Sequence, residues 1–427
     1  MDAFHERLIV RAATIDELLS CDFEPLSGQK NDAELAARRL AAWCRECASG
    51  DWTLFSQRLA RDRLSFVATL GKFATVHRSA SAATPAWLDD AIWIEAALQS
   101  SAANKPVAEI GSLEPYPFEH LFAPVVAKAE SLLWSGCGAG VSDRLNSSAR
   151  DCLRLSLLGA LSQLCAPALY ERFRKTAAAD SPSPPTPDSQ QPSTTRYEHF
   201  VAAMQAGGFR QLFEEKPVLL RLIASLTRQW IAATGDFLRR LDADADLIAQ
   251  DILHSGTGST IVKIEGDLSD PHHGGHSVKI ITFEDGGRIV YKPKTVSLDV
   301  AWQCLVERLN QADPPTELRA MRALARDGYG WTEFIDHKGC ADEADCGRFF
   351  RRAGAWLALF HCFIGTDMHQ ENIIACGDHP VPIDLEMLLQ SAVKQPKGPE
   401  ELASDAAKEV IANSVMMVGL LLSLIHI

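Results

Sequence analysis

The sequence predicts an α+β protein in which a mostly helical first part is joined to a smaller part that contains strands. In the first part, apolar residues recur at spacings of three and four, as in "AELAARRLAAWCRECA", which is the period of one helix face. From about residue 255, β-branched runs such as "STIVKIEGDLS" and "HSVKIITFEDGGRIVYKPK" replace that pattern. We therefore expect the architecture to change near this residue.

The bulk properties exclude several classes of protein. The 427 residues allow two or three domains, and 47% hydrophobic with 23% charged residues is typical of globular chains. A net charge of -13 argues against nucleic-acid binding, which needs clustered Lys and Arg. The N-terminal residues lack the apolar core of a signal peptide, so we expect a cytoplasmic protein. Eleven cysteines, with the single CxxC at Cys44 and Cys47, suggest free thiols rather than a disulfide framework or a zinc site.

The elements of the second part follow a recognisable order. A strand is followed by a turn with Gly274 and Gly275, a second strand, a hairpin signal at 285–287 and a third strand that ends at Lys292. The helical pattern "SLDVAWQCLVERLN" comes next. The N-lobe of a kinase is built in this order, with a Gly-rich turn over the phosphates and a Lys on the third strand.

A short polar loop supplies the remaining kinase signals. Asp367 and Asn372 are five residues apart, like the catalytic Asp and the metal-binding Asn of kinases. Asp384 follows twelve residues after Asn372, at the end of the apolar run "PVPI". His369 completes a DxHxxN pattern, which looks more like the loop of lipid kinases than that of protein kinases. The sequence therefore predicts an ATP- and Mg²⁺-dependent phosphotransferase.

Three further residues have open roles. Lys294 would share a strand face with Lys292 and could bind phosphate, although Pro293 between them suggests that the strand is ending. Glu307 is a candidate for the helix carboxylate that pairs with Lys292, or an ordinary exposed Glu. Glu386 could assist Asp384 at the metal or cap a turn.

Several long motifs resemble one family. The stretches "LFEEKPVLLRLIASLTRQWIAATGDFLRRL", "SDPHHGGHSVKIITFEDGGRIVYKPKTVSLDVAWQCLVERLN" and "FFRRAGAWLALFHCFIGTDMHQENIIACGDHPVPIDLEML" closely resemble the dehydratase region of type II lanthipeptide synthetases, the LanM family. The likeness extends to "YPFEHLFAPVV" near residue 116. It implies a lipid-kinase-like bilobal core with added helices, which phosphorylates Ser and Thr of a ribosomal precursor peptide and eliminates the phosphate to give dehydroalanine or dehydrobutyrine.

The resemblance assigns roles to residues at matching positions. Asp270 and His272, beside the Gly-containing turn, would serve elimination. Asp367 and His369 would act on the substrate hydroxyl. The remaining assignments are Lys292, Lys294, Gly274 and Gly275 for ATP, and Asn372 and Asp384 for Mg²⁺.

Composition and residue pattern, together with the resemblance, set the expected domains, and the resemblance implies the partners. We expect helices over 1–176, a disordered Pro/Ser/Thr-rich loop over 177–196, a helical scaffold over 197–254, a kinase-like N-lobe over 255–336 and a truncated C-lobe over 337–427. Zinc is expected only in a cyclase domain, which this chain lacks. The expected partner is the precursor peptide, a leader plus a core rich in Ser, Thr and Cys, and association with an export transporter is a further expectation.

The truncation carries an expectation of its own. Without the rest of the C-lobe, apolar residues 415–424 would lack partners, so the chain itself would be unstable and inactive. The final run "NSVMMVGLLLSLIHI" is shorter than the ~20 residues of a bilayer span and is expected to be a truncated core helix, so no stable membrane insertion is expected.

Two alternatives remain at this stage. A lipid or small-molecule kinase would use Lys292, Asp367, Asn372 and Asp384 without elimination. A non-catalytic module would use the helical half to bind a leader peptide and would not depend on Asp384.

Overall fold

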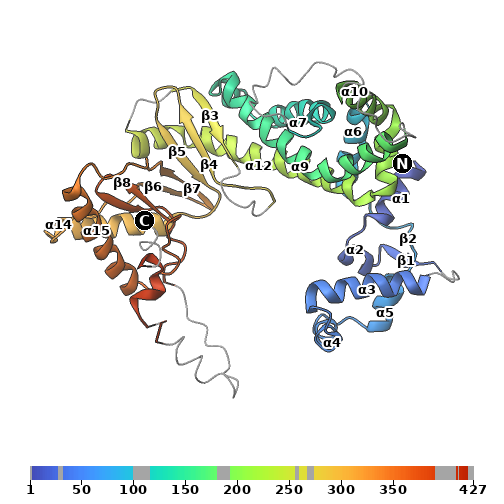
Figure 1. Cartoon of the computed structure of the whole chain (residues 1–427), viewed down its shortest axis with the longest axis horizontal. Helices are drawn as coiled ribbons and strands as arrows, with labels where there is room; N and C mark the ends of the chain where they lie inside the picture. Colours follow the sequence, from blue (N-terminus) through green and yellow to red (C-terminus); the bar gives the residue numbers. More distant parts are fainter. Residues whose placement is uncertain are drawn as a thin grey trace, which may run out of the picture. The chain divides into compact units, whose positions relative to one another are not determined.

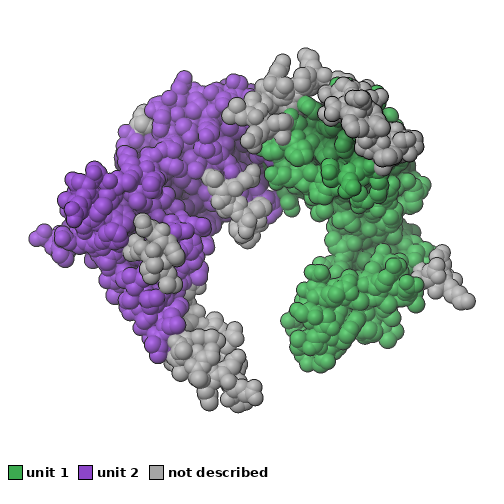
Figure 2. Space-filling view, viewed as in Figure 1, with its two compact units in different colours: residues 1–133, 157–232 green, residues 134–156, 233–427 purple. Residues whose placement is uncertain are grey.

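The computed structural model describes residues 2–26, 32–99, 116–179, 193–254, 259–266, 274–389, 410–411 and 413–421. The chain divides into two compact units (Figure 2). Unit 1 comprises Met1–Leu133 and Leu157–Ala232, and unit 2 comprises Trp134–Ser156 and Ala233–Ile427. The expected α+β class is confirmed, since helices dominate and the strands form a few small sheets (Figure 1).

Unit 1 is built mainly from helices, as the apolar spacing predicted. Its helices before residue 100 are α1 (Ala3–Arg11), α2 (Ile15–Leu19), α3 (Asp32–Ala48), α4 (Trp52–Arg61), α5 (Phe66–Lys72) and α6 (Trp87–Leu98). The later ones are η3 (Glu119–Leu121), α7 (Ala123–Gly136), α9 (Ser147–Ala179), α10 (Ser193–Ala203), η4 (Met204–Gly208), α11 (Phe209–Glu215) and α12 (Pro217–Ala243). Of these, α7, α9 and α12 also contribute residues to unit 2.

Local capping explains where several of these helices begin. Asp51 accepts hydrogen bonds from the backbone N–H groups of Thr53 and Leu54, at 2.7 and 3.1 Å, and so caps α4. Thr14 and Glu17 form a reciprocal capping box on α2. The short strands β1 (Phe23–Pro25) and β2 (Val76–Arg78) interrupt the helices and pair antiparallel, which the sequence did not reveal.

The predicted break in the helical part lies mostly outside the described residues. Helix α9 continues to Ala179 and α10 begins at Ser193, so the ends of the expected loop over 177–196 are helical. Residues 180–192 lie outside the described part of the chain.

Helix α9 is also long and apolar enough to cross a membrane, over Ser147–Thr176. Several of its side chains, Leu157, Leu158 and Leu161 among them, are fully buried within the protein. A core helix passes the same test of length and composition, so this feature is weak support for a membrane span.

Unit 2 is centred on a five-stranded antiparallel sheet in the order β3-β4-β5-β7-β6. Its strands are β3 (Ile261–Glu265), β4 (Lys279–Phe283), β5 (Arg288–Lys292), β6 (Ala323–Arg326) and β7 (Tyr329–Glu333). The three predicted strands, the hairpin and the helix after them are confirmed, with α14 (Ser297–Gln311) following β5. The β6–β7 hairpin was not foreseen, although Gly328, at φ +76°, occupies its turn.

Aromatic side chains and one carboxylate fix the sheet to the helix before it. Phe237 of α12, Tyr291 of β5 and Trp331 of β7 are at most 1% exposed, and the Tyr291 and Trp331 rings lie 5.0 Å apart. Asp244 accepts hydrogen bonds from the Trp331 Nε1–H at 2.9 Å and the Tyr329 hydroxyl at 2.8 Å. The short helices nearby in the chain are α8 (Ala139–Asp143), α13 (Ala245–Leu247) and η5 (Ile248–Leu253).

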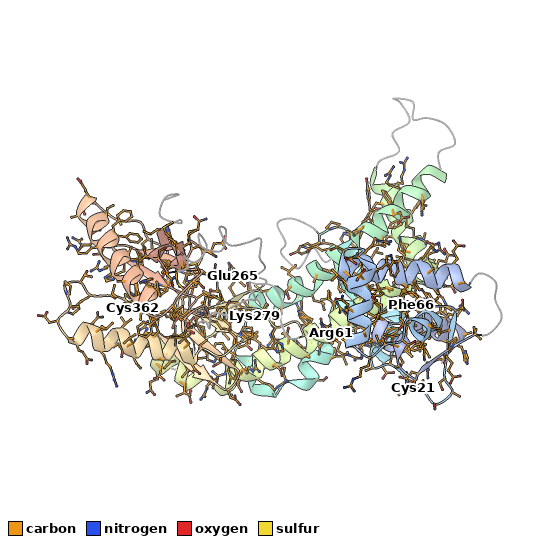
Figure 3. The ribbon with its side chains drawn as sticks, turned by 90° about the horizontal axis from the view of Figure 1, so that it is seen from below. Cys21, Arg61, Phe66, Glu265, Lys279 and Cys362 are labelled. Carbon is orange, nitrogen blue, oxygen red and sulfur yellow. The ribbon has the colours of Figure 1, made fainter. Side chains whose placement is uncertain are left out.

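A helix and a small hairpin complete the described part of unit 2. Helix α15 (Glu343–Cys362) precedes the hairpin of β8 (Ile373–Cys376) and β9 (His379–Pro382). In the turn of that hairpin, the Asp378 carboxylate forms ion pairs with Arg348 and Arg352 of α15, each at 2.7 Å. These two pairs attach the hairpin to the helix, and Figure 3 labels Cys362 at the other end of α15.

The end of the described chain corrects one expectation. Residues 415–418 form a single 3-10 turn, η6 (Val415–Val418), in place of the first part of the expected core helix, and residues 420 and 421 are again helical. Val418 and Leu420 are 1% and 3% exposed and pack in a core cluster with Trp302 and Phe360. The expectation that this apolar segment lacks partners is therefore wrong for these two side chains, while residues 422–427 lie outside the description.

Candidate functional site

A cleft of about 300 Å³ lies over one part of the sheet in unit 2. Strands β4 and β5 and the segment after β7 supply an apolar lining, including Ile280, Val290 and Ile335. Its polar lining includes Lys292, Lys294, Asn372 and Asp384, which come from the end of β5 and from both sides of the β8–β9 hairpin. Four of the residues predicted from the sequence therefore share one cleft of the size that small-molecule sites have.

Lys292 is held at the end of β5 by two oxygen atoms. Its Nζ lies 3.4 Å from the Asp299 carboxylate and donates a hydrogen bond of 2.6 Å to the Ile383 carbonyl. The side chains of Lys292 and Asp299 are each 9% exposed. Burial raises the pKa of Asp299 above its usual value, and the neighbouring Lys292 opposes that rise.

The structure decides between the two roles left open for Glu307, which is an ordinary exposed residue. Glu307 lies two turns further along α14, is exposed, and accepts a hydrogen bond from Gln303 at 2.8 Å. The carboxylate that contacts Lys292 is Asp299, in the first turn of the same helix. The sequence offered a weak signal for it, because an Asp in a first helical turn is common whatever its role.

Lys294 contacts the acidic pair at the other side of the cleft. Its Nζ lies 3.2 and 3.4 Å from the two carboxylate oxygens of Asp384 and also contacts Glu386. Burial would lower the pKa of Lys294, but the two carboxylates outweigh it and raise the pKa. Asp384 thus faces a cation in this structure, and Glu386 shares that cation.

The loop between α15 and β8 holds the other predicted residues. Asp367 has φ +63°, a left-handed conformation that is unfavourable for a residue with a side chain. The loop is held in place because the Met368 N–H bonds to the Val418 carbonyl at 2.8 Å and the Thr366 N–H to the Met387 carbonyl at 3.1 Å. The His369 Nε2 lies 3.5 Å from Asp367 Oδ1, so the structure brings these two side chains together.

Asn372 links that loop to the strand before Asp384. Its side-chain Nδ2 donates to the Asp367 carbonyl at 2.8 Å, and its own carbonyl accepts from the Ile383 N–H at 2.9 Å. Since the Nδ2 is used inside the loop, the amide oxygen is the group that can bind a ligand. Asn372 and Asp384 therefore reach the cleft from neighbouring segments.

The side-chain oxygen atoms of Asn372 and Asp384 are of the type that Mg²⁺ binds. Among the described residues, no three or more His, Cys, Asp or Glu side chains form a cluster that could hold a metal by itself. Mg²⁺ is commonly held by one or two protein oxygen ligands together with phosphate and water, and Asn372 and Asp384 could provide the protein ligands.

All eleven cysteines are free thiols, Cys44 and Cys47 included.

The Gly-containing turn is described only in part. Gly274 and Gly275 have φ values of +84° and +99°, which favour Gly at both positions. The candidate elimination residues Asp270 and His272 lie outside the described residues.

Comparison with known proteins gives two matches. Residues 217–426 match the family model described as "Domain of unknown function (DUF4135)". The chain is 24% identical over 204 residues to a curated protein of Lactococcus lactis subsp. lactis, the "Lacticin 481/lactococcin biosynthesis protein LcnDR2". That alignment covers 45% of this chain and 22% of the relative, so the chain matches less than a quarter of the relative's length.

Proposed function

Because the chain belongs to the family of type II lanthipeptide synthetases, we propose that its sheet-bearing unit is the kinase-like part of a dehydratase. It binds ATP and Mg²⁺, phosphorylates Ser and Thr of a precursor peptide, and eliminates the phosphate. The observation that carries this proposal is the gathering of Lys292, Lys294, Asn372 and Asp384 in one cleft. The relative named for lacticin 481 biosynthesis supports a ribosomal precursor peptide as the substrate.

The kinase-like reading rests on how the cleft is built. A five-stranded antiparallel sheet lies on one side, and the loop and hairpin after α15 lie on the other, as in the two lobes of a kinase. The apolar lining from β4, β5 and the segment after β7 suits a nucleobase. The two lysines suit the phosphates. When a nucleotide displaces Lys294 from Asp384, the positive charge of Lys294 becomes available to the phosphates.

The charged groups of the cleft divide the work of phosphoryl transfer. Lys292 is kept in place by Asp299 and is proposed to hold ATP phosphates. Asn372 and Asp384 would hold Mg²⁺, which neutralises charge on the phosphates and fixes their orientation. Asp367 orients the Ser or Thr hydroxyl and accepts its proton, while His369 at 3.5 Å stabilises the carboxylate or the developing charge.

Elimination then uses a base near the Gly-containing turn. The Cα–H bond of the phosphorylated residue breaks, a carbon–carbon double bond forms, and the bond from Cβ to the phosphate oxygen breaks to release phosphate. We assign proton transfer and stabilisation of the departing phosphate to Asp270 and His272 by family resemblance. Phosphorylation precedes this step because phosphate is a far better leaving group than hydroxide.

The remaining parts of the proposal come from the family. We propose a cytoplasmic protein that works beside an export transporter, with zinc needed only by a cyclase domain. The proposed domains keep the boundaries expected from the sequence, with the N-lobe over 255–336 and the beginning of the C-lobe over 337–427.

Nucleotide binding is the direct test of the cleft. We expect the complete protein encoded by the gene to bind a fluorescent ATP analogue in the presence of Mg²⁺, and Lys292→Met and Asp384→Asn to weaken that binding at least about tenfold, because each removes a charged contact. Glu307→Gln is the matched control, since Glu307 is exposed and accepts a hydrogen bond from Gln303, outside the cleft. Equal affinity in all four proteins would remove the cleft as the nucleotide site.

Peptide mass tests the reaction. The complete protein encoded by the gene, given ATP, Mg²⁺ and its precursor peptide, should remove one water per modified Ser or Thr. We expect His272→Ala to accumulate phosphorylated peptide and Asp367→Asn to leave the peptide unchanged. Phosphorylation without water loss by the unaltered protein would indicate a kinase without elimination. Peptide binding without any change of mass, unaffected by Asp384→Ala, would indicate a binding module.

A further inference from the structure

A second cavity, outside the cleft and within unit 1, lies beside β2. It measures about 510 Å³ and is lined by one face of α1 and by five consecutive residues, 76–80, of β2 and the segment after it. A strand that presents its side-chain face to a cavity contributes alternate residues, whereas a strand that presents its edge contributes consecutive ones. The cavity, here named the β2 groove, therefore runs along the open edge of β2.

The hydrogen-bond register shows which backbone groups face the groove. The Ser79 N–H bonds to the Asp22 carbonyl at 2.8 Å, and the Leu26 N–H bonds to the Thr75 carbonyl at 2.9 Å. In an antiparallel pair, hydrogen-bonded positions alternate with positions whose backbone groups point away from the partner strand. Val76 and Arg78 occupy the alternate positions, opposite Pro25 and Phe23.

In the described ranges β2 pairs with β1, and no backbone hydrogen bond outside the helices and strands involves Val76, which is 5% exposed, or Arg78, which is half-buried. Two donors and two acceptors are thus arranged along the groove at strand spacing. An open strand edge of this kind pairs readily with another extended chain.

The walls of the groove have a basic character. Arg7, Arg11 and Arg78 line it together with His77, and Glu6 is the acidic residue among its lining side chains. The Arg7 side chain is 57% exposed and contacts Glu214 at 2.8 Å, while Arg78 lies 3.6 Å from Glu6. In a chain whose net charge is -13, three guanidinium groups along one groove favour an acidic occupant.

We propose that the β2 groove binds an extended, acidic segment of peptide as a third strand on the β1–β2 sheet. The backbone of Val76 and Arg78 pairs with the peptide backbone, and Arg7 and Arg11 contact its acidic side chains. This proposal rests on the proposed function in one respect, because it takes a peptide to be the substrate. It adds a place, away from the nucleotide cleft, where part of such a peptide is held.

Binding of synthetic peptides tests the proposal without ATP. The probe is a fluorescein-labelled, end-capped peptide of eight alternating Glu and Val residues, measured by fluorescence anisotropy with the full chain. We expect saturable binding that weakens about tenfold in the Arg7→Gln/Arg11→Gln double variant, since exposed ion pairs contribute factors of up to about five each. The matched control is Arg61→Gln, on α4 and labelled in Figure 3, which removes an exposed Arg of unit 1 outside the groove.

Two altered peptides separate strand pairing from simple charge attraction. A version with N-methyl groups on alternate backbone nitrogens keeps the charges but cannot pair along that edge, and it should not bind. A version with Lys in place of Glu should also fail. Equal binding of the methylated peptide would overturn strand addition, equal binding of the Lys peptide would overturn the acidic preference, and no binding of the first probe would overturn the proposal.

The result is independent of the cleft. Loss of ATP binding in Lys292→Met with normal peptide binding would contradict only the nucleotide site, and the reverse result would contradict only the β2 groove.

Discussion

Two aspartates of unit 2 differ in how exposed they are and in which partners the protein supplies to them. Asp244, below the sheet, is 1% exposed and accepts hydrogen bonds from Arg326, Tyr329 and Trp331. Asp384, in the cleft, has a side chain that is 33% exposed and shares Lys294 with Glu386. The first carboxylate has its bonds completed by its own fold, whereas the second is paired with a cation that a ligand could displace.

This difference distinguishes a carboxylate that has a structural role from one that, in the proposed function, binds a ligand. Burial raises the pKa of Asp244, but the hydrogen bonds from Arg326, Trp331 and Tyr329 outweigh it and hold the pKa below its usual value. A buried carboxylate with all its partners present has little left to offer a substrate. Lys294, Asp384 and Glu386 place one positive charge against two negative ones on an accessible surface, which is suited to binding a further cation.

The largest expected effect is on stability at Asp244. Asp244→Ala should lower the free energy of unfolding by about 3–5 kcal/mol, because it leaves Arg326, the buried Trp331 N–H and the half-buried Tyr329 hydroxyl without their acceptor. Urea denaturation followed by circular dichroism measures it. Asp242→Ala is the matched control: its pair with Arg144 is 37% exposed on each side, so we expect a loss under about 1 kcal/mol. Similar losses in the two variants would contradict the structural role given to Asp244.

A smaller effect on stability is expected at the buried pair of Lys292 and Asp299 beside the cleft. Asp299→Asn should lower the free energy of unfolding by about 1–3 kcal/mol, since Lys292 keeps its charge but loses its carboxylate. Glu307→Gln should change it by less than about 0.5 kcal/mol, because Glu307 is exposed. The same urea titration distinguishes them, and a larger loss in Glu307→Gln would restore Glu307 as the partner of Lys292.

At Asp384 we expect a small effect on stability and a larger effect on nucleotide binding, which is the reverse of the expectation for Asp244. Asp384→Ala is expected to change the free energy of unfolding by less than about 1 kcal/mol, because Lys294 retains Glu386 and the site is partly solvated. Nucleotide affinity in the presence of Mg²⁺ should nevertheless fall. A loss of stability as large as that of Asp244→Ala would show that the cleft carboxylate is structural, and the contrast between the two sites would disappear.

The smallest expected effect is a change in stability in acid at Asp378, in the turn between β8 and β9. Hydrogen bonds from Arg352 and Arg348 lower the pKa of Asp378 to about 2. Its contribution to stability is complete above the usual Asp pKa near 3.8 and is lost as pH falls from there toward about 2. Asp378→Asn should flatten the fall in melting temperature over this interval relative to the unaltered chain. Parallel curves for the two proteins would contradict this coupling.

Local patterns carried much of the fold. The β4–β5 hairpin follows from two β-branched runs around 285–287, and Gly286 adopts φ +87° in its turn. The helices of unit 1 follow from apolar spacing and from caps such as Asp51. Strands β1, β2 and β6 escaped because three- and four-residue strands give too short an alternating pattern to recognise, and the five-residue β7 was missed together with its partner β6.

The sequence by itself determined the order of elements and the spacing of Asp367, Asn372 and Asp384, because both depend on residues near one another in the chain. Only the tertiary structure decided which carboxylate meets Lys292, that Lys294 bridges Asp384 and Glu386, and that Asp244 collects three donors. These contacts join residues up to about 90 positions apart, for which one sequence contains no distance information. Their geometry is set by how the sheet, α14 and the hairpin pack, and packing is a property of the whole chain.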